Sequence, residues 1–237
     1  NIKNILILYE GQPFQNEIVR ISKENFNINT IGYVHAPPVA FPSNYIKKKY
    51  SPDKIYLAGK DQHKVFLKLG WKKKELNLCE SLRFYKTNKS FDKKIYFPIN
   101  FRSEKNTLES IKFLIKNFNL SGYKVQLHPA SATAAKNITI QKKILSLISH
   151  SSSKKKKLSY PIFIGSTGSV IEALENNSKK AIHITENDIM EKYSNKIWLS
   201  LKNKKLKSNL YLYELKKKGN LLKLGKKKKN INFFFKN

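Results

Sequence analysis

The sequence predicts an α/β protein of two Rossmann-like domains. Short apolar runs that suit strands alternate with segments of helical spacing, and this β–turn–α order is typical of mainly parallel, doubly wound sheets. The alternation is interrupted at 84–94, a polar, lysine-rich segment, and then starts again. Polar motifs follow several predicted strands, at the sheet edge where α/β proteins bind ligands.

Residues 1–88 form the predicted N-terminal domain. Its strands are apolar runs closed by Gly or Pro, and its helices place apolar residues on one side. In chain order we expect a strand at 2–9, a helix at 14–22, strands at 29–35 and 54–58, a helix at 61–69 and a strand at 76–81. Because the chain begins with Asn1 and not with Met, the simplest interpretation is a fragment, or a domain cut from a longer protein.

Residues 89–200 form the predicted C-terminal domain. We expect strands at 94–98, 123–127, 160–164 and 180–185, and helices at 107–118, 138–149 and 168–176. The pattern weakens beyond Lys192, so 201–237 is predicted to be a lysine-rich tail. Its lysines at 226–229 and phenylalanines at 233–235 suit either a membrane-surface segment or a frayed end, and we favour the frayed end.

The net charge of +31 suggests an anionic partner, but the choice of basic residues, nearly all lysine, argues against nucleic acid. Arg20, Arg83 and Arg102 are the arginines, so 47 basic residues less three leave 44 lysines. Arginine is the preferred residue for bidentate recognition of bases and phosphates. We therefore favour a compositional bias of an AT-rich genome, with attraction to anionic membrane or substrate as the alternative.

Cysteine content and hydropathy point to a location inside the cell. Cys79 is the single cysteine, so an intrachain disulfide is excluded, and a reducing compartment is expected. No apolar run is long enough to span a bilayer. We expect a cytoplasmic protein, with peripheral contact at the inner face of the cytoplasmic membrane left open.

Two motifs at predicted strand ends carry the strongest functional signal. His128-Pro129 ends one strand, and its imidazole suits a phosphate oxygen, although a strand-end histidine can also be structural. A turn rich in glycine and hydroxyl residues joins another strand to a helix. Its residues exceed what a helix cap needs, so we favour phosphate binding over capping alone. Glu172 lies one turn into that helix and suits ribose hydroxyls. The turn comprises Gly165, Ser166, Thr167, Gly168 and Ser169.

Carboxylate and imidazole candidates for catalysis lie in the N-terminal domain. Glu10 precedes Gly11 at the end of the first strand, a place suited to a general base or to a surface carboxylate that caps the next helix. His35 ends the second strand and is expected at the same rim, in a catalytic or a structural role. Glu17 is a second acidic candidate. His63, His150 and His183 lack partners at metal-ligand spacing, so no metal and no cofactor are expected.

The motifs together resemble bacterial surface-carbohydrate glycosyltransferases of the GT-B architecture, related to the sialyl- and Kdo-transferases that use CMP-sugars. The resemblance covers about residues 5–185, and its specificity lies in the order and spacing of short motifs. The matching stretches are Tyr-Glu-Gly-Gln-Pro-Phe at 9–14, Gly-Tyr-Val-His at 32–35, Pro-Asp-Lys-Ile-Tyr-Leu-Ala-Gly at 52–59, His-Pro-Ala at 128–130 and Gly-Ser-Thr-Gly-Ser at 165–169.

This resemblance implies a metal-independent, inverting glycosyltransferase. It would move a sugar from a nucleotide-sugar donor, CMP-linked, to a surface polysaccharide, capsule or lipopolysaccharide acceptor, which can be lipid-linked. Glu10 would be the general base, and His128, Ser166 and Thr167 would hold the nucleotide phosphate on the C-terminal domain. The family has more sheet before the first match, where this chain starts, so the resemblance implies that the N-terminal domain is incomplete. The family also carries an aromatic-acidic pair where this chain has Phe14-Gln15.

Three other functions remain open from the sequence. A polyol-phosphate transferase of the teichoic-acid type would share the layout and use a CDP-polyol. A nucleic-acid-binding protein would use the lysine surface. A truncated or inactive paralogue would fit the Asn1 start and the lysine-rich end.

Overall fold

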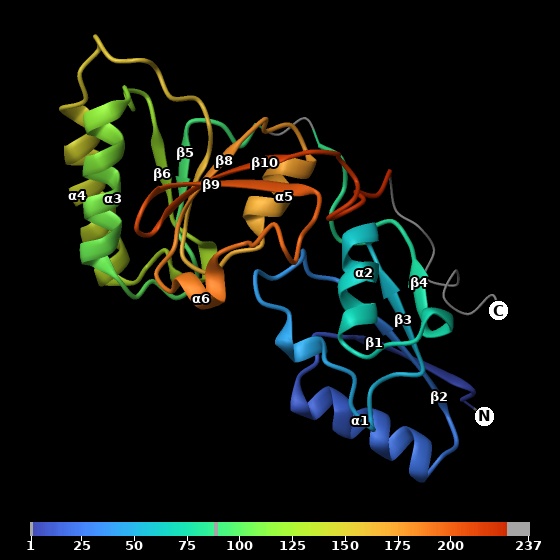
Figure 1. Ribbon diagram of the computed structural model, residues 1–237. Coiled ribbons are helices and arrows are strands. Elements are labelled where there is room, and N and C mark those ends of the chain that lie inside the picture. Colours follow the sequence, from blue (N-terminus) through green and yellow to red (C-terminus); the bar gives the residue numbers. More distant parts are fainter. Residues whose placement is uncertain (1, 88–89, 227–237) are drawn as a thin grey trace. The chain divides into compact units, whose positions relative to one another are not determined.

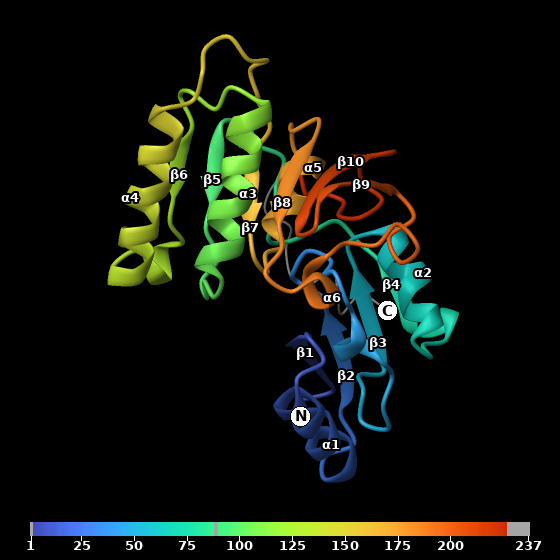
Figure 2. The same cartoon turned by 60° about the vertical axis from the view of Figure 1, so that its left-hand side comes forward.

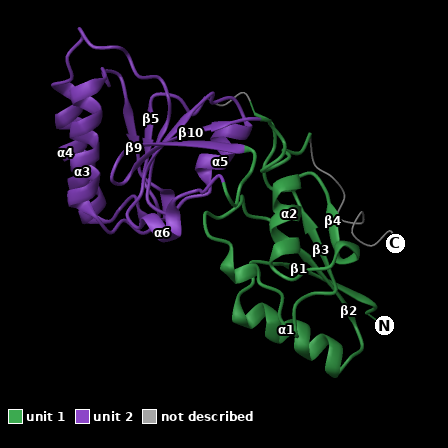
Figure 3. Cartoon of the chain, viewed as in Figure 1, with its two compact units in different colours: residues 1–87, 196–200, 217–237 green, residues 88–195, 201–216 purple. Residues whose placement is uncertain are grey.

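The computed structural model describes residues 2–87 and 90–226 as an α/β protein with one parallel and one mixed sheet (Figure 1). The described residues fall into two compact units (Figure 3). The first unit contains 2–87, 196–200 and 217–226, and the second contains 90–195 and 201–216. The chain thus returns twice from the second unit to the first.

The sheet of the first unit has four parallel strands, side by side in chain order (Figure 2). They are β1 (Asn4–Leu8), β2 (Asn29–Tyr33), β3 (Lys54–Leu57) and β4 (Leu76–Leu78). The helices are α1 (Pro13–Glu24) and α2 (Lys60–Lys68), with 3₁₀ turns η1 (Ser43–Tyr45) and η2 (Lys73–Glu75).

The core of the first unit is rich in aromatic side chains. Tyr9, Tyr45, Phe66 and Trp71 are buried and in ring contact, and the Trp71 indole donates to the Tyr45 carbonyl over 2.8 Å. Burying large rings supplies much of the hydrophobic stabilisation that a four-stranded sheet needs. The Tyr9 hydroxyl donates to the Asn16 side-chain oxygen over 3.1 Å, so burial leaves this phenol and the Trp71 indole N–H hydrogen-bonded.

The two C-terminal segments complete the first unit by docking on α2. The Ser200 N–H donates to the buried Asp61 carboxylate over 2.6 Å, and the Gln62 amide donates to the Leu221 carbonyl over 2.8 Å. A Cβ on Gly59 would lie 2.2 Å from that same Leu221 oxygen. Glycine is therefore needed at 59 for the close approach of the two backbones.

The second unit has a six-stranded mixed sheet in the order β6-β5-β7-β8-β10-β9. Its strands are β5 (Lys94–Tyr96), β6 (Lys124–Gln126), β7 (Ile162–Ile164), β8 (Ala181–Ile184), β9 (Leu201–Lys207) and β10 (Leu210–Leu215). Its helices are α3 (Glu104–Asn117), α4 (Ala135–Ser149), α5 (Ser169–Glu175) and α6 (Asp188–Glu191), with a 3₁₀ turn η3 (Pro129–Ser131).

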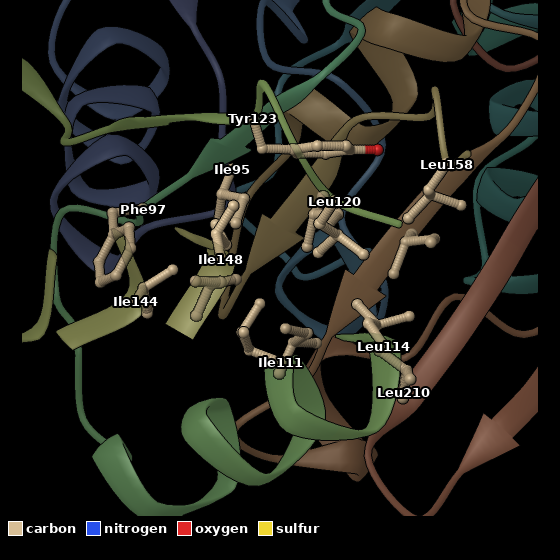
Figure 4. Close-up of a cluster of buried hydrophobic side chains, with 14 of the residues drawn as sticks. Ile95, Phe97, Ile111, Leu114, Leu120, Tyr123, Ile144, Ile148, Leu158 and Leu210 are labelled. Carbon is tan, nitrogen blue, oxygen red and sulfur yellow. The ribbon is translucent and has the colours of Figure 1, made fainter. Parts of the chain in front are cut away.

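The main core of the second unit lies between the sheet and the neighbouring helices α3 and α4 (Figures 1 and 4). Ile111 and Leu114 of α3 pack with Ile144 and Ile148 of α4 against Ile95 of β5. These helix residues recur at three- and four-residue spacing, which puts them on one face of each helix. Burial of that face fixes both helices on the sheet.

Strand order in the second unit changes direction at β5. The chain runs from β5 to β6 on one side of it and then crosses to β7 on the other side. The pairs β5–β6, β5–β7 and β7–β8 are all parallel. Where a parallel sheet reverses its order, the loops after the two adjacent strands separate and leave room for a ligand. The carboxyl ends of β5 and β7 form such a position.

The predicted strands and helices of residues 2–185 are all present, with ends shifted by a few residues. The border between the units falls inside the predicted break at 84–94. The predicted tail is wrong for 201–216, because β9 and β10 form an antiparallel hairpin on β8. Lysines mark an exposed edge strand, where they discourage pairing with other chains. Residues 227–237, which hold most of the stretch for which we favoured a frayed end over a membrane-surface segment, lie outside the described residues.

None of the described helices is long and apolar enough to cross a bilayer.

Candidate functional site

A cavity of about 350 Å³ opens at the carboxyl ends of β5, β6 and β7 in the second unit. Its volume lies in the range of about 300–1,000 Å³ that is usual for small-molecule sites. The walls come from three loops, one after each strand, and include the two strand-end motifs. The lining residues from those motifs are His128, Pro129, Ser166, Thr167, Gly168 and Ser169, together with Glu172.

His128 is oriented by its own turn. Its Nδ1 accepts a hydrogen bond from the Ala130 N–H over 3.2 Å, and its carbonyl accepts from the Ser131 N–H over 2.9 Å. An Nδ1 that accepts leaves the ring proton on Nε2, so a neutral His128 presents an N–H donor. The following Pro129 begins η3 and fixes this turn.

The loop Gly165–Ser169 forms another wall of the cavity. Gly165 has φ +65°, a left-handed conformation that favours glycine, and a Cβ there would also crowd Glu186 Oε2 at 2.9 Å and Pro98 Cγ at 3.1 Å. The Thr167 hydroxyl accepts from the Ser169 N–H over 3.2 Å. Helix α5, which follows the loop, has only seven residues, so the polar groups on this side of the cavity are mainly the loop's own amides and hydroxyls.

Glu172 and Tyr96 line the cavity beyond the loop. Tyr96 stacks on Phe163 of β7, with ring centroids 4.9 Å apart and planes 12° apart. Burial, reinforced by the nearby Glu172 carboxylate, raises the pKa of the Tyr96 phenol to about 12, so it stays protonated at neutral pH. The cavity therefore combines an aromatic wall, a carboxylate and a loop rich in glycine and hydroxyl residues.

A second cavity of about 400 Å³ adjoins the first and shares Pro98, Ile99 and Ser166 with it. Glu186 and Glu191 line it. Glu186 accepts from the N–H groups of Arg102 and Ser103 over 2.7 and 2.6 Å, and Glu191 accepts from the Glu186 N–H over 2.7 Å. Burial raises the pKa of the Glu191 carboxyl. No sequence motif indicates these acids, because long-range packing brings them to the loop.

Glu10 and His35 lie together in the first unit, after β1 and β2. His35 Nε2 is 3.3 Å from Glu10 Oε1, while His35 Nδ1 is buried without a hydrogen-bond partner among the described residues. Burial lowers the pKa of His35, partly offset by the Glu10 carboxylate. A neutral His35 thus donates from Nε2 to Glu10 and has no second nitrogen exposed to a substrate.

The turn that carries Glu10 is rigid. The Gln15 side chain accepts from the N–H groups of Glu10 and Gln12 and donates to the Leu8 carbonyl. Gly11 has φ +71°, and a Cβ there would lie 2.0 Å from the Asn44 carbonyl oxygen. Glu17, the other acidic candidate, lies on the exposed side of α1 in an ion pair with Arg20.

The predicted phosphate-binding residues therefore converge on one cavity, except for Gly165, which begins the loop but does not line the cavity. The predicted catalytic residues Glu10 and His35 are in contact in the first unit. Among the described residues, no three His, Cys, Asp or Glu side chains are grouped as metal ligands. No family model, curated protein or solved structure matches this chain.

Proposed function

We propose that this protein is a GT-B glycosyltransferase with two Rossmann-like domains, which moves a sugar from a CMP-linked donor to a surface polysaccharide or lipopolysaccharide acceptor. The observation that supports this most strongly is the cavity at the strand-order reversal, lined by His128, Ser166 and Thr167. These groups suit the phosphate of a nucleotide, and Glu172 suits ribose hydroxyls.

In this mechanism, Glu10 takes the proton of the acceptor hydroxyl as that oxygen attacks the anomeric carbon. The bond from the anomeric carbon to the phosphate oxygen breaks, and configuration at that carbon inverts. His35 is assigned to orientation, because its one exposed nitrogen faces Glu10. His128 Nε2–H and the loop hydroxyls stabilise the charge that develops on the departing nucleotide. The proposal requires no metal ion.

A donor assay tests this proposal. The protein is incubated with a CMP-linked sugar, lipopolysaccharide and excess EDTA, and free CMP is measured over time. We expect acceptor-dependent CMP release that EDTA leaves unchanged. Donor that stays intact with and without EDTA would refute glycosyl transfer from CMP-sugars, and release that EDTA stops would refute the metal-independent mechanism.

One observation favours the second candidate, a CDP-polyol phosphotransferase. Glu186 and Glu191 line the cavity that continues from Ser166. Carboxylates accept hydrogen bonds from hydroxyl groups but repel another carboxylate, and both sialic acid and Kdo carry one. A neutral polyol suits this second cavity better than an acidic sugar. CMP release from CDP-glycerol, with CMP-sugars left intact, would establish this function in place of the first.

A further inference from the structure

Two buried side chains donate hydrogen bonds to the Gly165–Ser169 loop from beneath. His183 Nε2 lies 2.8 Å from the Gly165 carbonyl oxygen, and the Tyr193 hydroxyl donates to the Thr167 carbonyl over 3.3 Å. A carbonyl oxygen can only accept, so His183 carries its proton on Nε2. His183 is fully buried and Tyr193 is 2 % exposed, so neither side chain is available to touch a substrate.

The geometry of the peptide bond converts these contacts into a direction for the loop amides. In a planar trans peptide, the C=O of one residue and the N–H of the next point in opposite directions. With the Gly165 and Thr167 carbonyls turned inward, the N–H groups of Ser166 and Gly168 point the other way. Neither amide has an acceptor among the described residues, and both residues line the cavity.

We infer that His183 and Tyr193 are positioning residues, which hold the Ser166 and Gly168 amides outward to bind the phosphate oxygens of a nucleotide. This inference rests on the proposed function and extends it to two residues that no motif indicated. The amides add two fixed donors to His128 and the loop hydroxyls, at no cost in side-chain ordering when the ligand binds.

Both positioning residues are themselves held by the strand hairpin. The Tyr193 N–H donates to the Tyr213 hydroxyl over 3.1 Å, and the Asn203 amide donates to the Tyr193 carbonyl over 2.9 Å. The Tyr213 ring also contacts His183, with centroids 6.0 Å apart. Asn203 and Tyr213 belong to β9 and β10, so this hairpin supports the loop as well as closing the sheet.

Removing single donors tests the inference. Tyr193→Phe keeps the ring and deletes the hydroxyl, and Tyr211→Phe is the matched control, because the Tyr211 hydroxyl donates to Asp188 instead of the loop. His183→Leu removes the donor, and His183→Gln restores an N–H near the Nε2 position. The readouts are the affinity for CMP by calorimetry and the melting temperature of the unliganded protein.

We expect CMP binding to weaken about three- to ten-fold in Tyr193→Phe and in His183→Leu, as loss of one positioning hydrogen bond implies. Tyr211→Phe should bind as the wild type does, and His183→Gln should regain most of the affinity. Wild-type affinity in Tyr193→Phe, or an equal loss in Tyr211→Phe, would overturn the inference alone. A wild-type protein that binds no nucleotide would overturn the proposed function together with it.

Discussion

Glu10 is the residue on which the proposed chemistry depends. Its carboxylate accepts from His35 and lies after β1, on a turn that Gln15 fixes. Glu10→Gln keeps the shape but cannot take a proton, so we expect kcat to fall about 10²- to 10⁴-fold with little change in donor affinity. Steady-state kinetics measures both. Glu17→Gln, on the exposed side of α1, is the control; an equal loss there, or normal turnover in Glu10→Gln, would refute the assignment.

His183 makes stability depend on pH. Burial lowers its pKa to about 4, against an ordinary value of 6.5, so the unfolded chain binds a proton at a pH where the folded chain does not. Folding stability therefore falls as pH drops from about 6.5 to about 4, by up to about 3 kcal/mol. We expect the melting temperature of the wild type to fall more steeply across this window than that of His183→Gln. Parallel curves would contradict this prediction. His35 is present in both proteins, so its titration contributes equally to the two curves.

At the scale of elements, the β1–α1 turn shows why a motif glycine is needed. Gly11→Ala places a Cβ against the Asn44 carbonyl while the residue keeps its left-handed φ. The left-handed conformation alone costs an alanine roughly 1–2 kcal/mol, so we expect a loss of stability well above that. Gly122→Ala is the matched control, because Gly122 has φ +80° but nothing within 4 Å of the added Cβ. Thermal or urea unfolding measures the difference. Equal losses in both variants would show that the contact with Asn44 has no cost.

The hairpin β9–β10 shows where sequence patterns fail. Parallel strands such as β7 are buried on both faces and appear as apolar runs, so they were predictable. The edge strand β9 carries Lys202, Lys204, Lys205 and Lys207 and appeared to be a tail. Its pairing is fixed by β10, whose Leu210 and Tyr213 are fully buried. Local composition does not contain that long-range contact.

The same limit applies to the candidate site. His128, the Gly165–Ser169 loop and Glu172 were predictable, because short motifs after strands meet at one sheet edge. Glu186, His183 and Tyr193 were not, since each acts through a partner far from it in sequence. From its spacing, His183 is only a metal-ligand candidate without partners. Its burial, not its spacing, reveals its role.

At the scale of the whole molecule, each of the two units carries part of the proposed machinery, with Glu10 in the first and the cavity in the second. A net charge of +31 adds non-specific attraction for any anion, so nucleotide binding has to be measured at moderate salt. At moderate salt, binding to a specific site is lost when one cavity side chain is removed, whereas general attraction to the charge is not.

Nucleotide binding by His128→Ala is therefore the most direct test. Thermal shift with CMP, CDP, UDP, GDP and ADP is compared for the wild type, His128→Ala and the control His150→Ala, whose exposed side chain contacts Ser146 at the end of α4. A ligand that binds only the folded protein raises its melting temperature. We expect a cytidine nucleotide to stabilise the wild type and His150→Ala, but not His128→Ala. No shift with any nucleotide, or an equal shift in His128→Ala, would contradict a nucleotide site in this cavity.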